Sequence, residues 1–87
     1  MSDEAPPLVA YPTHYVFKAM GPAGIQARVR ELVESVLGPL GDGAFVELPS
    51  SKGKYVSVSA HVHLQNEDQR KRVYQAFHQE KQIVFYL

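Results

Sequence analysis

Three histidines of the chain are candidates for metal chemistry. His61 and His63 lie two residues apart in a run that alternates apolar and polar residues, so both point to the same side of a predicted strand. His14, in another predicted strand, falls on the same face of the sheet. Imidazoles bind zinc and copper, but a flat sheet spaces its side chains about 5 Å apart and encloses nothing. We therefore favour polar surface or interface residues, keep a metal site as the alternative, and predict no cofactor.

The hairpin segment Lys52-Gly53-Lys54-Tyr55 resembles the start of a basic-aromatic RNA-binding motif. RNA-recognition sheets need two or three stacking aromatic residues at alternate positions. After Tyr55 the alternate positions hold Ser57, Ser59 and His61 instead. Nine Lys and Arg residues balance nine Asp and Glu residues, so no net charge attracts a polyanion. RNA binding is therefore the alternative function, and nucleic acid is not the expected partner.

A glycine-containing turn, Gly21-Pro22-Ala23-Gly24, precedes a predicted helix and could present backbone N–H groups to an anion. The turn has neither the lysine of a phosphate loop nor the glycine spacing of a dinucleotide site. Arg28 follows one turn into the helix, and acylphosphatases use an arginine in such a loop. No asparagine lies on the third predicted strand to position a water molecule. We therefore expect no enzyme, and acylphosphatase chemistry is the least favoured alternative.

Length and composition limit the chain to one small domain. Its 87 residues, 45% hydrophobic and 21% charged, are typical of a single globular unit. So small a core disfavours a deep, enclosed active site. The absence of cysteine excludes disulfides and thiolate chemistry and fits the cytoplasm. Residues 1–10 are acidic and proline-rich and predict a flexible tail rather than a signal peptide or membrane span, followed by a domain over residues 11–87.

Hydrophobic periodicity predicts the elements that position these residues. Strands are expected over residues 13–20, 44–48, 54–64 and 83–87. A first helix begins with Pro22 in its first turn and ends at the glycine cap Gly38. Asn66 is the predicted N-cap of a second helix, with Gln69 as its capping-box partner. The first helix buries a stripe formed by Ile25, Val29, Leu32, Val33, Val36 and Leu37.

The order of these elements predicts a ferredoxin-like βαββαβ fold, an α+β sandwich. Its antiparallel sheet has four strands, with the first and third in the middle and both helices on one face. The second strand ends at Pro49 and is expected at an edge. The last strand, all apolar over residues 83–87, needs cover on both sides or a central neighbour. In the third strand Val56, Val58, Ala60, Val62 and Leu64 face the core.

Three motifs and the order of the elements match a known family. The motifs are Tyr11-Pro12-Thr13, Lys18-Ala19-Met20-Gly21, and the stretch Ser50-Ser51-Lys52-Gly53-Lys54-Tyr55-Val56-Ser57-Val58-Ser59. On these residues the chain resembles, over about residues 11–87, the YbeD-like family of small bacterial proteins of unknown function. The resemblance implies a bacterial cytoplasmic domain similar in shape to ACT regulatory domains. It implies no catalytic or ligand-binding residues.

We expect a noncatalytic binding or regulatory domain that acts through its open sheet face, the face away from the helices. Aromatic and imidazole side chains with few charges are typical of an interface. The expected occupants are a partner protein, a second copy of the chain or a small-molecule effector, and no membrane is involved. The predicted binding residues are His14, Val16, Lys18, Tyr55, Ser57, Ser59, His61, His63 and Phe85.

Overall fold

The strands and helices of the computed structural model follow the predicted order. The structure describes residues 10–49 and 53–87. The predicted tail therefore lies outside the described residues except for Ala10. The predicted turn over residues 50–53 also lies outside them except for Gly53. The elements are β1 (Thr13–Pro22), α1 (Ile25–Leu37), the 3₁₀ turn η1 (Asp42–Ala44), β2 (Phe45–Pro49), β3 (Tyr55–Leu64), α2 (Glu67–Gln79) and β4 (Phe85–Tyr86).

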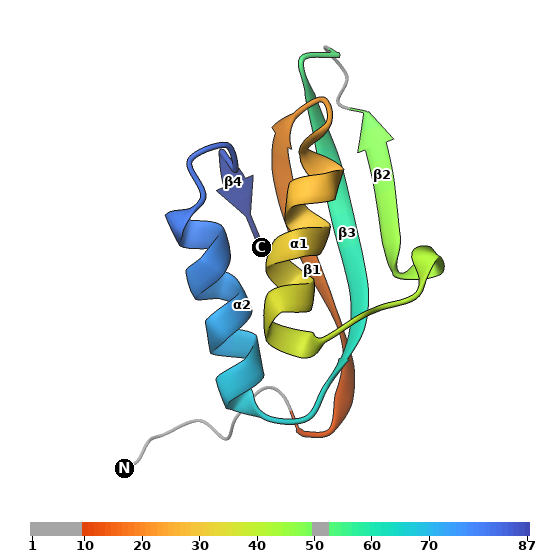
Figure 1. Cartoon of the computed structure of the whole chain (residues 1–87), viewed down its shortest axis with the longest axis vertical. Coiled ribbons are helices and arrows are strands. Elements are labelled where there is room, and N and C mark those ends of the chain that lie inside the picture. Colours follow the sequence, from red (N-terminus) through yellow and green to blue (C-terminus); the bar gives the residue numbers. More distant parts are fainter. Residues whose placement is uncertain (1–9, 50–52) are drawn as a thin grey trace.

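The four strands form one antiparallel sheet in the order β2-β3-β1-β4. The ferredoxin-like α+β fold is therefore confirmed, with β1 and β3 in the middle and β2 at an edge as predicted. Figure 1 shows α1 in front of the central strands and α2 beside it. No helix in the described part of the chain is long and apolar enough to cross a membrane.

The core lies between the sheet and the helices. In β3 every second residue from Val56 to Leu64 is buried, which confirms the face that the alternation predicts. From α1 the predicted stripe contributes three fully buried residues, and Leu32, Val36 and Leu37 pack against them half-buried. The buried residues of this core are Phe17, Ala19, Ile25, Val29, Val33, Phe45, Val56, Val58, Ala60, Val62, Leu64, Val73, Phe77 and Ile83.

The predicted start of α1 is wrong by three residues. Pro22 does not begin the helix; it ends β1, where it pairs with Tyr55. Gly24 then adopts φ 93°, a left-handed conformation that glycine takes without strain, and the helix begins at Ile25. Gly21 is confined by close packing, because a Cβ there would lie 2.7 Å from the carbonyl oxygen of Gln82. The strand therefore continues into the predicted turn as far as Pro22.

The helix ends largely follow the predicted caps. The Gly38 N–H donates to the carbonyl of Glu34, which confirms the glycine C-cap of α1. The Asn66 side chain accepts from the Gln69 N–H at 2.9 Å, so the N-cap of α2 is confirmed. The Gln69 side chain accepts from the N–H of Gln65 rather than from Asn66, so it reaches one residue further than a capping box requires.

The last strand is shorter than predicted. The Ile83 N–H donates to the carbonyl of Glu80, which places Ile83 in a turn rather than in β4. Backbone pairing with β1 begins with the Val84 N–H and continues to Leu87, which exchanges two hydrogen bonds with Lys18. β4 thus has the central neighbour that its sequence requires, but it lies at an edge. Among the described residues, nothing covers the face that Phe85 and Leu87 share, and both are more than half exposed.

Candidate functional site

Cross-strand pairing places all nine predicted binding residues on the open sheet face. His14 pairs with His63, Val16 with His61, and Lys18 with Ser59 across β1 and β3. Residues paired directly across antiparallel strands lie on the same face. The same alternation places Tyr55 and Ser57 there, and Phe85 of β4 joins through its partner Met20.

One end of this face is a histidine end formed by His14, His61 and His63. The ring centroid of His14 lies 5.7 Å from that of His61 and 6.1 Å from that of His63. All three residues are exposed. Within residues 10–49 and 53–87, however, no group of three His, Asp or Glu side chains could hold a metal ion. The geometry supports a polar surface here more than a metal site.

The other end is an apolar end formed by Met20, Val46, Leu48, Phe85 and Leu87. One row runs across all four strands, because Leu48 pairs with Ser57, Ser57 with Met20, and Met20 with Phe85. Val46 occupies the next row, opposite Ser59, and Leu87 closes that row beside Lys18. The exposed fractions are 44% for Val46, 59% for Leu48, 55% for Phe85 and 61% for Leu87, so these side chains keep much of their apolar surface in water.

The apolar end contains a hollow of about 210 Å³. Pockets for drug-sized ligands span about 300–1,000 Å³, so this hollow suits one large apolar side chain better than a cofactor. Its lining residues are Lys18, Ala19, Met20, Ser57, Phe85 and Leu87.

Lys18 has the one charged side chain among the described residues of the open face. It is exposed, and within the described part of the chain it forms no ion pair. The paired residue Ser59 supplies a hydroxyl and Leu87 supplies apolar surface. The Lys18 ammonium group therefore stands at the rim of an apolar hollow without a paired Asp or Glu side chain among the described residues.

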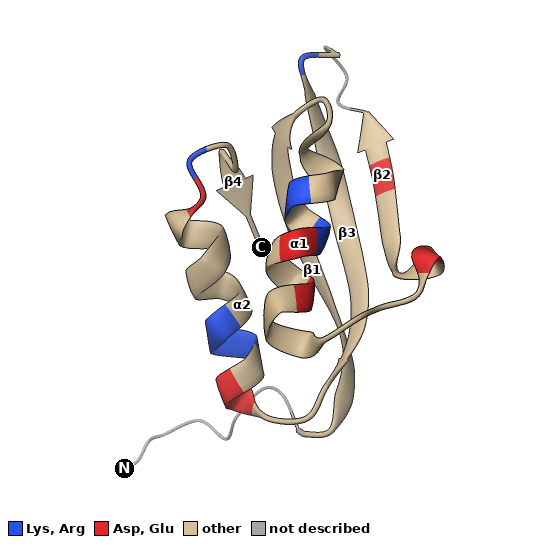
Figure 2. Ribbon diagram, in the orientation of Figure 1, with Lys and Arg blue, Asp and Glu red and all other residues tan. Residues whose placement is uncertain are grey.

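The charged residues of the helix layer, in contrast, are largely paired. Figure 2 shows Lys, Arg, Asp and Glu residues on both helices and on the loops. Arg28 donates to Glu80 and to Glu31, each at 2.6 Å, and so links α1 to the end of α2. The Arg28 guanidinium holds the pKa of Glu80 below its ordinary value. Because Arg28 already binds two carboxylates, it is poorly placed to hold an acyl phosphate.

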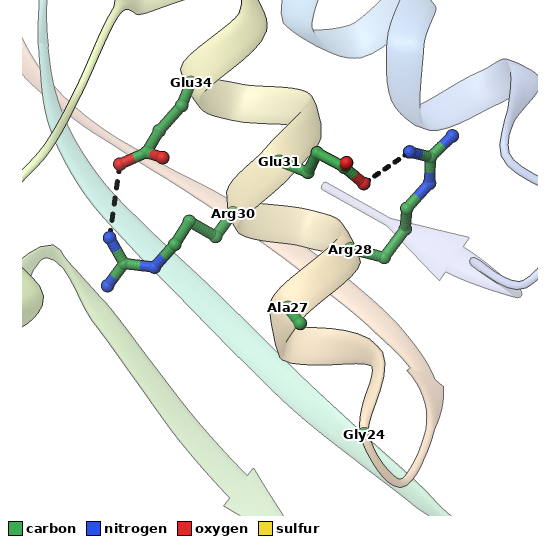
Figure 3. A pocket seen from close by; sticks show the side chains of 6 residues that line it. All are labelled: Gly24, Ala27, Arg28, Arg30, Glu31 and Glu34. Atoms are coloured by element: carbon green, nitrogen blue, oxygen red, sulfur yellow. Dashed lines mark hydrogen bonds and ion pairs between the residues drawn. The ribbon is translucent and has the colours of Figure 1, made fainter.

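A second, shallow hollow along α1 is also lined by charged side chains that pair with each other. Figure 3 shows Arg28 and Arg30 pointing to opposite sides of the helix, each joined to a glutamate. Arg30 pairs with Glu34 at 3.2 Å and lies over the ring of Phe45, 4.5 Å from its centroid. The paired charges leave no free cation to attract an anion at this hollow.

Polar contacts join α2 to Tyr11, just before β1, and to Tyr15 of β1. The Tyr11 hydroxyl donates to Glu67 at 2.5 Å, and Arg70 donates to the same carboxylate. The Arg70 guanidinium, and then the Tyr11 hydroxyl, lower the pKa of Glu67 to about 2. The Tyr15 and Tyr74 hydroxyls lie 2.9 Å apart, and burial together with this contact raises the pKa of Tyr74. These groups hold the helix layer on the sheet and lie off the open face.

Sequence reasoning left four residues out of the predicted site: Met20, Val46, Leu48 and Leu87. Met20 shares its face with His14 by alternation alone, so the signal for it was present in β1. For Val46 and Leu48 the five residues of β2 define two faces but not which one is buried. The buried Phe45, opposite Ala60, settles that choice in the structure.

Comparisons with known proteins identify a family and a fold. No curated protein matches the chain. The solution structure of protein HP0495 from H. pylori is similar, with a TM-score of 0.74 and 22% sequence identity, over 100% of this chain and 93% of that one. At this identity the likeness shows the fold alone. The family model described as "Protein of unknown function (DUF493)" matches residues 6–87. The chain therefore belongs to the DUF493 family of proteins of unknown function, which includes the YbeD-like proteins.

Proposed function

We propose that this chain is a noncatalytic binding domain whose open sheet face docks on a partner protein. The observation that carries the proposal is the uncovered apolar end of that face. Leu48, Phe85 and Leu87 are more than half exposed, although they belong to the same sheet whose other face carries the buried core. Contiguous exposed apolar surface marks interaction sites more often than plain surface. A regulatory role in a bacterial cytoplasm, similar to that of ACT domains, fits the family resemblance and the absence of cysteine.

Binding is favoured over catalysis by the arrangement of the ionisable groups. Within the described residues of the open face, the ionisable side chains besides His14, His61 and His63 are those of Lys18 and Tyr55. General acid–base chemistry needs titratable groups that converge on one reacting atom. Lys18 lies two rows of the sheet away from His14, and the hollow beside Lys18 is smaller than pockets for drug-sized ligands. The face offers contact area rather than a reaction site.

A protein is favoured over RNA because the face lacks the features that bind RNA. Its described residues carry one positive charge, whereas phosphate contacts dominate nucleic-acid affinity. Tyr55 and Phe85 are its aromatic residues besides the histidines, and they lie in different rows on strands that are not neighbours. Of the basic-aromatic segment, Lys52 lies outside the described residues. Titration with single-stranded RNA at low salt tests this alternative, and tight binding would favour it.

Site-specific photo-crosslinking tests the proposal. A photoreactive amino acid replaces Ser59, in the middle of the open face, or Gln75, an exposed residue of α2 that serves as the matched control. In native cell extract we expect discrete protein adducts from position 59 and none of the same adducts from position 75. Equal adducts from both positions, or none from position 59, would contradict a docking role for the open face.

A further inference from the structure

The chemistry of the partner can be inferred from the apolar end, and this inference rests on the proposed function. We infer that the apolar end docks a segment of a partner protein in which a carboxylate side chain lies beside a large apolar side chain. The apolar side chain enters the hollow between Met20 and Phe85, and the carboxylate pairs with Lys18. The juxtaposition of one unpaired ammonium group with one apolar hollow carries the inference.

The hollow sets the size of the apolar group. It lies where β4 meets β1, with Phe85 and Leu87 on one side and Ser57 on the other. Its volume of about 210 Å³ admits one large side chain but not a helix or a cofactor. Anchoring one apolar side chain in a pocket at the centre of a contact is how interfaces gain much of their energy.

Lys18 indicates which charge the partner segment must carry. A partner that covers the hollow also removes water from the Lys18 ammonium group, because Lys18 lines the same hollow. Burial of an unpaired charge is costly, so a purely apolar partner would bind poorly. A carboxylate from the partner removes this penalty and fixes the orientation of the segment.

The described residues of the open face of a second copy do not supply that carboxylate side chain. In a symmetric face-to-face contact each copy presents the same surface, so each brings one Lys18 and, among the described residues of the open face, no Asp or Glu. The acidic residue of the sheet, Glu47, pairs with Val58 and so lies on the opposite side of β2. Charge complementarity therefore favours a different protein over self-association.

Selection of random peptides tests the inference without knowledge of the natural partner. A phage-displayed library of random peptides is selected in parallel on the wild type and on Lys18→Glu. We expect the wild type to enrich peptides with Asp or Glu next to Phe, Leu or Ile. We expect Lys18→Glu to enrich Lys or Arg in place of the acid, because like charges repel across an interface.

Affinities of the selected peptides then locate the contact. A synthetic peptide enriched on the wild type is expected to bind Lys18→Glu about tenfold or more weakly. Ser57→Leu, which fills the hollow while keeping the charge, is expected to weaken binding similarly. Lys71→Glu, an exposed lysine on α2, is the matched control and is expected to change affinity less than about twofold. Circular dichroism melts verify that each variant is folded.

Three outcomes would overturn the inference: no enrichment of acidic-apolar peptides, equal affinity for the wild type and Lys18→Glu, or a larger loss in Lys71→Glu. They are distinguishable from failure of the proposed function. If position 59 gives protein adducts and Lys18→Glu leaves them unchanged, the docking role stands and the partner chemistry is wrong. If position 59 gives no adducts, the docking role itself fails.

Discussion

The two faces of the sheet use the same alternating strands in opposite ways. On the helix-covered face Phe17, Val58 and Leu64 have no exposed surface. On the open face Phe85 and Leu87, equally apolar, are 55% and 61% exposed. Because β-propensity favours apolar residues on both faces, it does not explain the difference. The buried core of this domain is therefore formed without the open face, and the apolar residues there remain accessible to another molecule.

The two faces also differ in whether their charged side chains are paired. Two ion pairs of α1 reach other elements, because Arg28 pairs with Glu80 at the end of α2 and Arg30 pairs with Asp42 of η1. The Tyr11 hydrogen bond to Glu67 adds another such link. The open face presents Lys18 without such a partner among the described residues. Charges therefore help to fix the helices, whereas the charge on the open face contributes nothing visible to the fold.

Matched valines test the difference in packing, and the largest effect is expected there. Val58→Ala and Val33→Ala each remove two buried methyl groups and are expected to lower the free energy of unfolding by about 1–3 kcal/mol. Val46→Ala, on the open face of the same sheet, is expected to cost less than about 0.5 kcal/mol. Urea unfolding midpoints measure all three. Equal midpoints for Val58→Ala and Val46→Ala would show that the two faces are assigned wrongly.

A pair of glycines tests the tight packing where β1 meets α1. In Gly21→Ala the new Cβ would lie 2.7 Å from the Gln82 carbonyl oxygen and 2.9 Å from Cγ1 of Ile25. We expect a loss of about 1–2 kcal/mol, since a backbone oxygen yields little. Gly43→Ala meets no atom within 4 Å and is the control, expected to change stability by less than about 0.5 kcal/mol. Thermal melts that rank the two variants in reverse would contradict this packing.

The sequence predicts the buried face better than the ends of the elements. Alternation in β3 identifies its buried residues because each side chain points away from the previous one, whatever its neighbours are. The end of β1 is mispredicted because Pro22 suits a first helical turn as well as the end of a strand. Only the packed structure shows that Gly24 takes the left-handed conformation and that Gly21 lies against Gln82.

In the candidate site, too, the features that depend on strand alternation are predictable from the sequence, and those that depend on strand pairing are not. Alternation alone places Lys18 and His61 on the open face, because both belong to long strands. The hollow depends on the pairing of Met20 with Phe85, which is a contact between residues distant in the sequence. The face of Leu48 depends likewise on its pairing with Ser57. Pairing register is a property of the whole sheet, so no local pattern could reveal the apolar end.

A pH series tests the electrostatic attachment of the helix layer. The folded-state pKa of Glu67 is lowered to about 2, below its ordinary value of 4.5. Its contribution to stability is therefore present above pH 4.5 and is lost as the pH falls towards 2. Glu67→Gln removes this titrating carboxylate. The slope of the free energy of unfolding against pH over this range is therefore expected to decrease by the equivalent of up to about one bound proton. Tyr11→Phe is expected to flatten it partly, and unchanged slopes in both variants would contradict the assignment.

The histidine end is where the smallest change in stability is expected. His61→Ser and His63→Ser together remove two exposed side chains of the open face, so the free energy of unfolding is expected to change by less than about 0.5 kcal/mol. A chelator is expected to leave the melting temperature of the wild type unchanged, because metal binding would otherwise stabilise the folded state by linkage. If the chelator destabilises the wild type but not the double variant, the histidine end holds a metal. If neither responds and the adducts from position 59 persist in the double variant, docking depends on the apolar end and the histidines are solvated surface.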